Sequence, residues 1–214
     1  MDVSSGSAAA ERAVLVRRGQ WYSRATLVYN TGEGIAAIVT GLMAGSIALV
    51  GFGIDSVIEV ISSGAALWRL RSDVDEARRE HAERVSLRLI GSCFLALSVY
   101  IVADAVRALW FHDLPQKTVP GIVVAVLSVI IMPILVRGKR KVASGLGSRA
   151  LHADAAQTSL CAYLSAIVLI GLVLNAVFGW WWADPAAALL MTPIIVKEGV
   201  EGLRGRDTCE DCHV

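Results

Sequence analysis

Six apolar stretches, separated by short polar or charged segments, organise this chain of 214 residues. Each stretch is close to the roughly 20 residues that an α-helix needs to cross the hydrocarbon core of a bilayer. The pattern therefore predicts an all-α membrane protein with six transmembrane helices. We place them at residues 25–44, 46–68, 88–110, 119–136, 154–178 and 181–200.

The boundary between the first two stretches is the hardest to place. Only Gly45 and Ser46 separate them. A single helix from Leu27 to Trp68 would be about twice as long as the bilayer is thick. We therefore expect a tight hairpin here rather than one continuous helix.

Positive charge predicts the orientation. Eighteen of the twenty Lys and Arg residues lie in the N-terminal arm, in two basic loops or near the C-terminal end, and only Arg107 and Lys117 lie on the other side. Because Lys and Arg are enriched in cytoplasmic segments, both termini are expected in the cytoplasm. The organisation is then a cytoplasmic arm (1–24), a six-helix membrane domain (25–202) and a cytoplasmic tail (203–214), with basic loops at 69–88 and 137–149.

Composition supports this class and excludes others. Hydrophobic residues make up 55% of the chain, against roughly 45 to 50% in soluble domains. The net charge of +1 and the topological role of the basic loops give no reason to expect a nucleic-acid partner. The sequence shows no catalytic nucleophile paired with a general base and no nucleotide-binding loop, so an enzyme is not expected. A cleavable signal peptide before the first stretch is not expected either. The sixteen Arg against four Lys favour a GC-rich bacterial genome, so the expected location is a bacterial cytoplasmic membrane.

Two acidic residues interrupt the second apolar stretch. Asp55 and Glu59 lie four residues apart, so both carboxylates point to one face of a helix. A charged side chain at the centre of a bilayer costs about 2.5 kcal/mol or more, and such residues usually serve a function. No Lys or Arg is expected at matching depth, so the pair predicts a cation site. The alternative is that both acids make structural contacts inside the helix bundle.

The fifth stretch carries a second pair at the same spacing, Gln157 and Cys161. Two facing helices would present four groups to one ion, because carboxylate and thiolate are ligands of transition metals and the amide is a weaker one. Asn30 and Glu33 share a face of the first helix, where they line the approach to this site or form a polar seam between helices.

These motifs resemble the cation diffusion facilitator family, whose members export divalent metals in exchange for protons. The second stretch matches the family pattern G-S-x-A-L-x-A-D-A-x-H/D-x-x-x-D at Gly45, Ser46, Ala48, Leu49, Asp55 and Glu59. The fifth matches A-D-A-x-H/D-x-x-x-D at Ala153, Asp154 and Ala155, and the sixth matches W-x-D-P at Asp184 and Pro185. The resemblance implies a metal site at Asp55, Glu59, Gln157 and Cys161.

The chain also departs from the family. Gln157 and Cys161 replace its usual His and Asp, Glu59 replaces Asp, and the long cytoplasmic domain after the last helix is not expected in this chain. The chain is similar to a short branch that includes a vesicular zinc-binding membrane protein of vertebrates. Asp154 is expected to lie off the face of Gln157 and Cys161, in a packing role or behind the ligands.

The resulting hypothesis is a homodimeric transporter in the lipid bilayer that exports a divalent transition metal in exchange for protons, without an organic cofactor. Zinc is the favoured substrate, with cobalt, cadmium, manganese and iron as alternatives. The rival hypothesis is a membrane metal sensor or regulatory subunit that binds metal without transporting it. In the tail, Cys209, Cys212 and His213 form a CxxCH motif that either captures metal or is an incidental feature of a disordered end.

Overall fold

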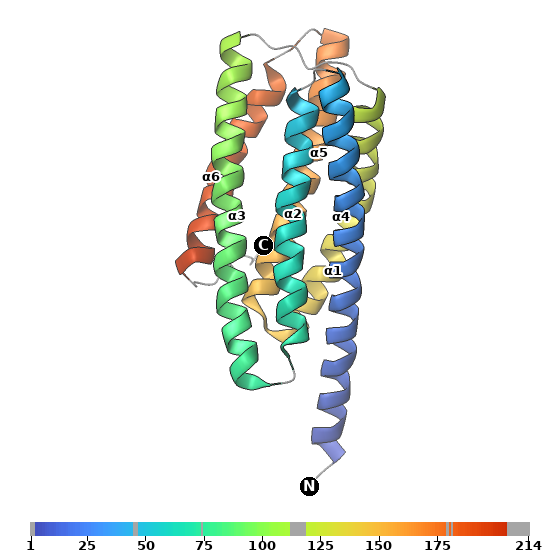
Figure 1. The fold of residues 1–214 in the computed structure, drawn as a ribbon, viewed down its shortest axis with the longest axis vertical. Helices are drawn as coiled ribbons and strands as arrows, with labels where there is room; N and C mark the ends of the chain where they lie inside the picture. Colours follow the sequence, from blue (N-terminus) through green and yellow to red (C-terminus); the bar gives the residue numbers. More distant parts are fainter. Residues whose placement is uncertain are drawn as a thin grey trace.

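The computed structural model is a bundle of long helices (Figure 1) and describes residues 3–44, 47–73, 75–111, 119–178, 180 and 182–204. The described part is entirely helical apart from short turns. Its elements are α1 (Val3–Ala44), α2 (Ile47–Arg71), α3 (Glu76–Phe111), α4 (Val119–Leu146), α5 (Arg149–Phe178) and α6 (Ala183–Arg204).

The helices agree with the six apolar stretches and extend beyond them. α1 ends at Ala44 and α2 begins at Ile47, so the first two stretches form separate helices as predicted. The two basic segments are not loops. Most of 69–88 belongs to α2 and α3, and most of 137–149 belongs to α4. Hydropathy marks where the bilayer core ends, whereas the backbone hydrogen bonds of a helix can continue beyond it. The apolar stretch alone therefore underestimates the length of the helix.

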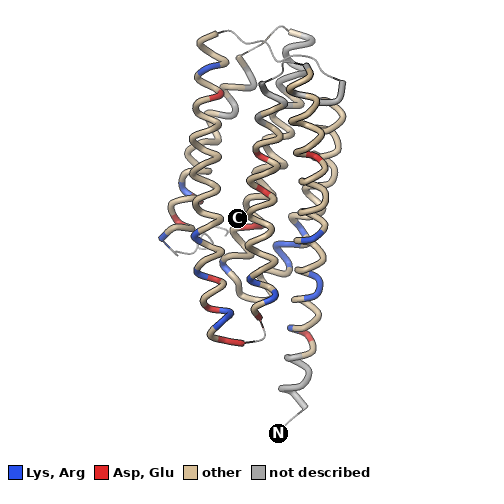
Figure 2. Tube along the Cα trace, viewed as in Figure 1, with Lys and Arg blue, Asp and Glu red and all other residues tan. Residues whose placement is uncertain are grey.

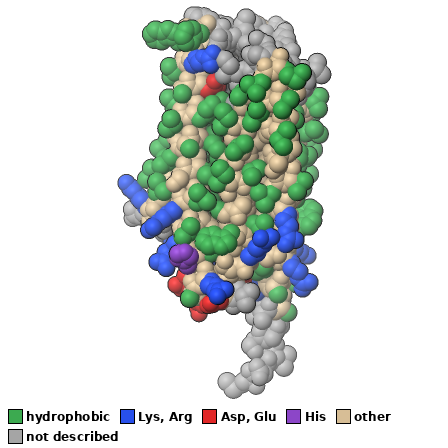
Figure 3. Space-filling view, in the orientation of Figure 1, with side chains coloured by type: hydrophobic (Ala, Val, Ile, Leu, Met, Phe, Trp, Pro, Cys, Tyr) green, Lys and Arg blue, Asp and Glu red, His purple; other side chains and the backbone are tan. Residues whose placement is uncertain are grey.

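The outer surface of the bundle is apolar over most of its length. Large hydrophobic side chains stand exposed on it, including Val28, Ile35, Val99 and Leu190, while Lys and Arg gather toward the end that carries the N-terminus (Figure 3). Such a belt is the surface that a lipid environment requires. By length and hydropathy alone, two helices within the described ranges could cross a membrane, Glu76–Phe111 and Ile122–Leu146.

A tight turn joins α4 to α5 at this charged end. Gly147 has a φ of 60°, a conformation that side chains with a Cβ rarely adopt, and the amide of Ser148 donates to the carbonyl of Ala143 (3.1 Å). Ser148 then caps α5 by accepting from the amide of Leu151 (3.2 Å). This arrangement of a left-handed glycine followed by an N-cap serine ends one helix and begins the next.

Glu83 of α3 fixes this turn to the rest of the bundle. Its carboxylate accepts from the Ser148 hydroxyl (2.7 Å) and from the Ala150 amide (2.6 Å), and it pairs with Arg69 of α2 (2.6 Å). Arg69 also pairs with Asp73 (2.8 Å). The charged ends of α2, α3 and α5 are therefore held together by charge-assisted bonds.

Helix packing brings distant segments side by side. The most extensive contacts join α1 to α2, α3 to α6 and α4 to α5, and α2 also packs on α5. Small residues permit the closest approaches. A Cβ on Gly91 of α3 would lie 2.8 Å from the backbone nitrogen of Leu203 in α6, and one on Gly34 of α1 would lie 3.3 Å from the Cβ of Ser56. Such contacts between small residues are a usual way for membrane helices to associate.

Candidate metal site

Asp55 and Glu59 point into the bundle from α2, as their spacing predicts. Their side chains are buried, with relative exposures of 5% and 0%. None of their four carboxylate oxygens has a hydrogen-bond partner among the described residues. Leaving a buried polar group unsatisfied costs about 1 to 3 kcal/mol, and more when the group is charged. Cys161 interacts electrostatically with both acids, and Lys139 interacts with Glu59.

The second predicted pair faces the same interior from α5. Gln157 and Cys161 are both buried, and the amide atoms of Gln157 are also without a partner in the described structure. The thiol of Cys161 interacts electrostatically with the carboxylates of Asp55, Glu59 and Glu33. Cys161 therefore lies near the acids where α2 packs on α5, and the placement of Gln157 opposite them stays a prediction.

The groups do not form a ready-made coordination shell. Within the described ranges, no three His, Cys, Asp or Glu side chains lie close enough together to hold one metal ion. What the fold provides is a cluster of buried carboxylates, one thiol and one amide that share an interior region. Acidic residues occur at mid-bundle depth on α1 and α2, away from the basic end (Figure 2).

Glu33 joins this cluster from α1. Its carboxylate accepts hydrogen bonds from Tyr29 (3.0 Å) and from Ser56 of α2 (3.1 Å). It therefore forms part of a polar seam between α1 and α2, and it also interacts electrostatically with Glu59. Asn30 is buried, donates to the carbonyl of Thr26 (3.1 Å) and leaves its own oxygen unpartnered. The Asn30 and Glu33 face therefore forms a polar seam next to the acids, and its role in lining an approach to the site stays a prediction.

A buried cation near the cluster contradicts the expectation that no Lys or Arg lies at this depth. Lys139 of α4 is 4% exposed and pairs with Asp154 of α5, with its Nζ 2.9 Å from Oδ2. The same ammonium donates to Ser63 of α2 (2.9 Å) and to Thr158 (2.8 Å). Ser63 in turn donates to Asp154 (3.1 Å).

The sequence contained a signal for this cation. α4 buries Met132, Leu135, Val142 and Leu146 along one stripe, and Lys139 continues that stripe at helical spacing. The prediction for Asp154 also needs correction. It lies seven residues before Cys161, almost two full turns, so it faces the same interior rather than lying off that face.

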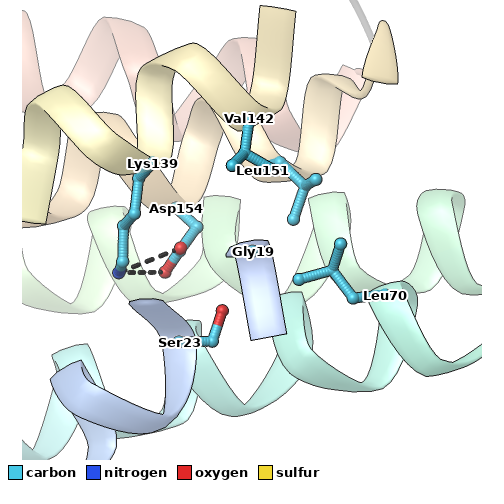
Figure 4. A pocket seen from close by; sticks show the side chains of 7 residues that line it. All are labelled: Gly19, Ser23, Leu70, Lys139, Val142, Leu151 and Asp154. Atoms are coloured by element: carbon cyan, nitrogen blue, oxygen red, sulfur yellow. Dashed lines mark hydrogen bonds and ion pairs between the residues drawn. The ribbon is translucent and has the colours of Figure 1, made fainter. Parts of the chain in front are cut away.

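A small cavity of about 10 Å³ adjoins the Lys139 and Asp154 pair. That volume is close to the minimum needed for one water molecule. Ser23 of α1 lies across the cavity from the ion pair, and Gly19, Leu70, Val142 and Leu151 complete its wall (Figure 4). The cavity therefore lies where α1, α2, α4 and α5 meet.

The tail motif lies outside this description. Cys209, Cys212 and His213 belong to residues 205–214, which are outside the described ranges. Its predicted role as a metal-capturing segment stays a prediction.

Comparison with known proteins agrees with the motifs and the fold. Residues 23–204 match the cation efflux transmembrane domain, which covers the second half of α1 and all of α2 to α6. The chain therefore belongs to the cation efflux family, also called the cation diffusion facilitators, and is an integral membrane protein of that family.

Several relatives resemble the chain at low identity. Transmembrane protein 163 of Xenopus laevis is 28% identical over 191 residues, which cover 86% of this chain and 66% of the relative. Magnetosome protein MamB of Paramagnetospirillum magneticum is 27% identical over 76% of this chain and 57% of its own. Cation-efflux pump FieF of Shewanella oneidensis is 28% identical over 55% of this chain and 44% of the pump. The chain thus spans between 44% and 66% of the length of these relatives.

Proposed function

We propose that this protein transports a divalent transition metal, with zinc as the favoured substrate, and that Asp55, Glu59, Gln157 and Cys161 hold the ion between α2 and α5. The observation that carries the proposal is the set of buried, unpartnered polar atoms on two helices that pack together. Family membership supports transport as the activity of this fold.

The chemistry of the four groups suits a borderline transition metal. Carboxylate oxygen and thiolate sulfur both bind zinc, and the thiolate also favours softer ions such as cadmium. The amide of Gln157 contributes a neutral oxygen. Two carboxylates balance the charge of a dication, which lowers the cost of placing the ion at the depth of the bilayer.

Proton exchange follows from the same groups. Carboxylates and thiols bind metal only when deprotonated, so metal binding releases protons and proton binding releases metal. We propose that the protein couples metal efflux to proton entry, with alternating exposure of the site produced by rocking of the helices. A homodimer is part of this proposal, and its interface is to be sought on the apolar outer surface.

The decisive experiment is uptake into proteoliposomes with zinc, cobalt, manganese and cadmium, comparing the wild type with Asp55→Ala. The variant should lose most of the zinc flux. Glu80→Ala is a matched control, because Glu80 is an exposed carboxylate on α3 outside the cluster. Equal flux in the wild type and Asp55→Ala would reject the site.

The same preparation separates transport from sensing. A pH-sensitive dye inside the vesicles should report proton movement opposite to that of zinc. Zinc binding to the purified chain without flux of either ion would instead identify a membrane metal sensor or regulatory subunit.

A further inference from the structure

Lys139 and Asp154 form a buried ion pair close to the proposed metal site. The ammonium of Lys139 contacts Asp154, Ser63 and Thr158 at 2.8 to 3.1 Å, so its three protons are all engaged. An ion pair at this depth is costly to assemble, and removing one partner leaves an uncompensated buried charge. The pair is therefore neutral as a unit, and the loss of either member would place a net charge beside the proposed site.

The residues that hold Lys139 lie one helical turn from Glu59. Ser63 lies four residues after Glu59 on α2, and Thr158 directly follows Gln157 on α5. One turn of helix rises about 5.4 Å, and the flexible four-carbon stem of lysine can cover such a step. Glu59 already interacts electrostatically with Lys139 and with Asp154.

Glu59 is available as a second partner for the lysine. Both of its carboxylate oxygens are buried and without a hydrogen-bond partner in the described structure, and Asp55 one turn away is in the same condition. The ammonium thus pairs with Asp154 and also interacts electrostatically with Glu59, whose oxygens accept no hydrogen bond from a described residue.

We propose that Lys139 is a built-in cation that competes with the metal for Glu59, and that Asp154, together with Ser63 and Thr158, positions it away from the site while a metal is bound. When the metal leaves, Lys139 shares its charge between Asp154 and Glu59, so that neither of these two carboxylates is left uncompensated while the helices return. The inference rests on the proposed metal site and adds residues that determine its affinity.

The test compares zinc binding to the purified full-length chain by titration calorimetry at one fixed pH. Asp154→Asn removes the carboxylate that positions Lys139, so the freed ammonium should occupy Glu59 and weaken zinc binding about tenfold or more, within the range of coupled sites. The double variant Lys139→Met with Asp154→Asn removes the competitor as well. It should bind zinc within about threefold of the wild type, or more tightly.

This rescue distinguishes competition from a structural role. A weakening in the double variant as large as in Asp154→Asn would overturn the proposal, and so would unchanged binding in Asp154→Asn. If Asp154→Asn does not fold, the double variant decides alone, because it carries neither buried charge. Zinc binding by the double variant that is more than about threefold weaker than in the wild type would then reject competition.

Glu83→Gln is the matched control, because it breaks a different interhelical ion pair, with Arg69. It should lower the melting temperature and leave zinc affinity unchanged. Asp55→Ala in the same series separates the two proposals. If Asp55→Ala binds zinc as the wild type does, the metal site itself is wrong. If Asp55→Ala loses zinc while Asp154→Asn does not, only the role of Lys139 is wrong.

Discussion

The carboxylates of Asp55 and Glu59 are buried without a partner, and this has a consequence for stability as well as for binding. A desolvated charge that nothing compensates destabilises the fold around it. Functional sites commonly keep such unfavourable groups at a cost in stability.

We predict that Asp55→Asn raises the melting temperature of the metal-free protein in detergent, because the amide keeps the shape of the carboxylate and removes its charge. The same change should abolish zinc binding. Thermal unfolding followed by intrinsic fluorescence, with and without zinc, measures both effects. A variant that melts lower and still binds zinc would show that Asp55 has a structural partner.

Cys161 differs from the other proposed ligands in its softness. Cys161→Ser replaces the sulfur by a harder oxygen, so the preference for cadmium over manganese should fall by about tenfold, or ~1.4 kcal/mol. Competition between these ions for the purified chain gives the ratio. Cys93→Ser is the control, because Cys93 is a buried thiol on α3 and is not one of the proposed ligands. An unchanged ratio in Cys161→Ser would exclude the sulfur as a ligand.

Among the helices, the contact of α3 with α6 depends on glycine. A Cβ on Gly91 would meet backbone atoms of Leu203 and Gly199 at 2.8 and 2.9 Å, and backbone cannot move aside as a flexible side chain can. By contrast, a Cβ on Gly32 of α1 would meet nothing within 4 Å. The two positions therefore test whether close packing or helix propensity determines how a Gly→Ala substitution changes the melting temperature.

Gly91→Ala should lower the melting temperature, because α6 must shift to admit the methyl group. Gly32→Ala should raise it, since alanine is favoured over glycine inside a helix by about 1 kcal/mol. Thermal unfolding of both variants under one detergent condition makes the comparison. Equal effects of the two substitutions would contradict the close approach of α3 and α6.

For the molecule as a whole, the uneven distribution of charge predicts its orientation in the membrane. Lys and Arg gather at the end that carries the N-terminus and the turn between α4 and α5 (Figure 2). Trp110 lies near the opposite end of α3 and is exposed. The positive-inside rule places the basic end in the cytoplasm.

Cysteine labelling tests this orientation. A membrane-impermeant maleimide added to whole cells should modify Trp110→Cys and leave Ser144→Cys unmodified until the membrane is opened. Both positions are exposed, and the experiment requires Cys209→Ser and Cys212→Ser to lower the background. The reverse pattern would invert the orientation and with it the proposed direction of transport.

Much of this architecture follows from local sequence signals. The apolar stretches predicted where the six helices lie, because a helix that crosses a bilayer requires a long apolar run. The spacing of Asp55 and Glu59 predicted a shared face, because four residues make about one helical turn. The same argument predicted the inward orientation of Gln157 and Cys161, and both pairs are buried. Their joint role as metal ligands stays a prediction.

Only the tertiary structure decided the charge environment of this interior. Lys139 and Asp154 lie on different helices, and nothing in either segment alone shows that Ser63 of α2 completes their network. Likewise, Glu83 binds the start of α5 from α3. Periodicity determines which face of a helix is buried, but the partner of a buried charge depends on how helices pack together. That packing is a property of the assembled bundle, so helical spacing could mark Lys139 as buried but could not show that Asp154, Ser63 and Thr158 surround it.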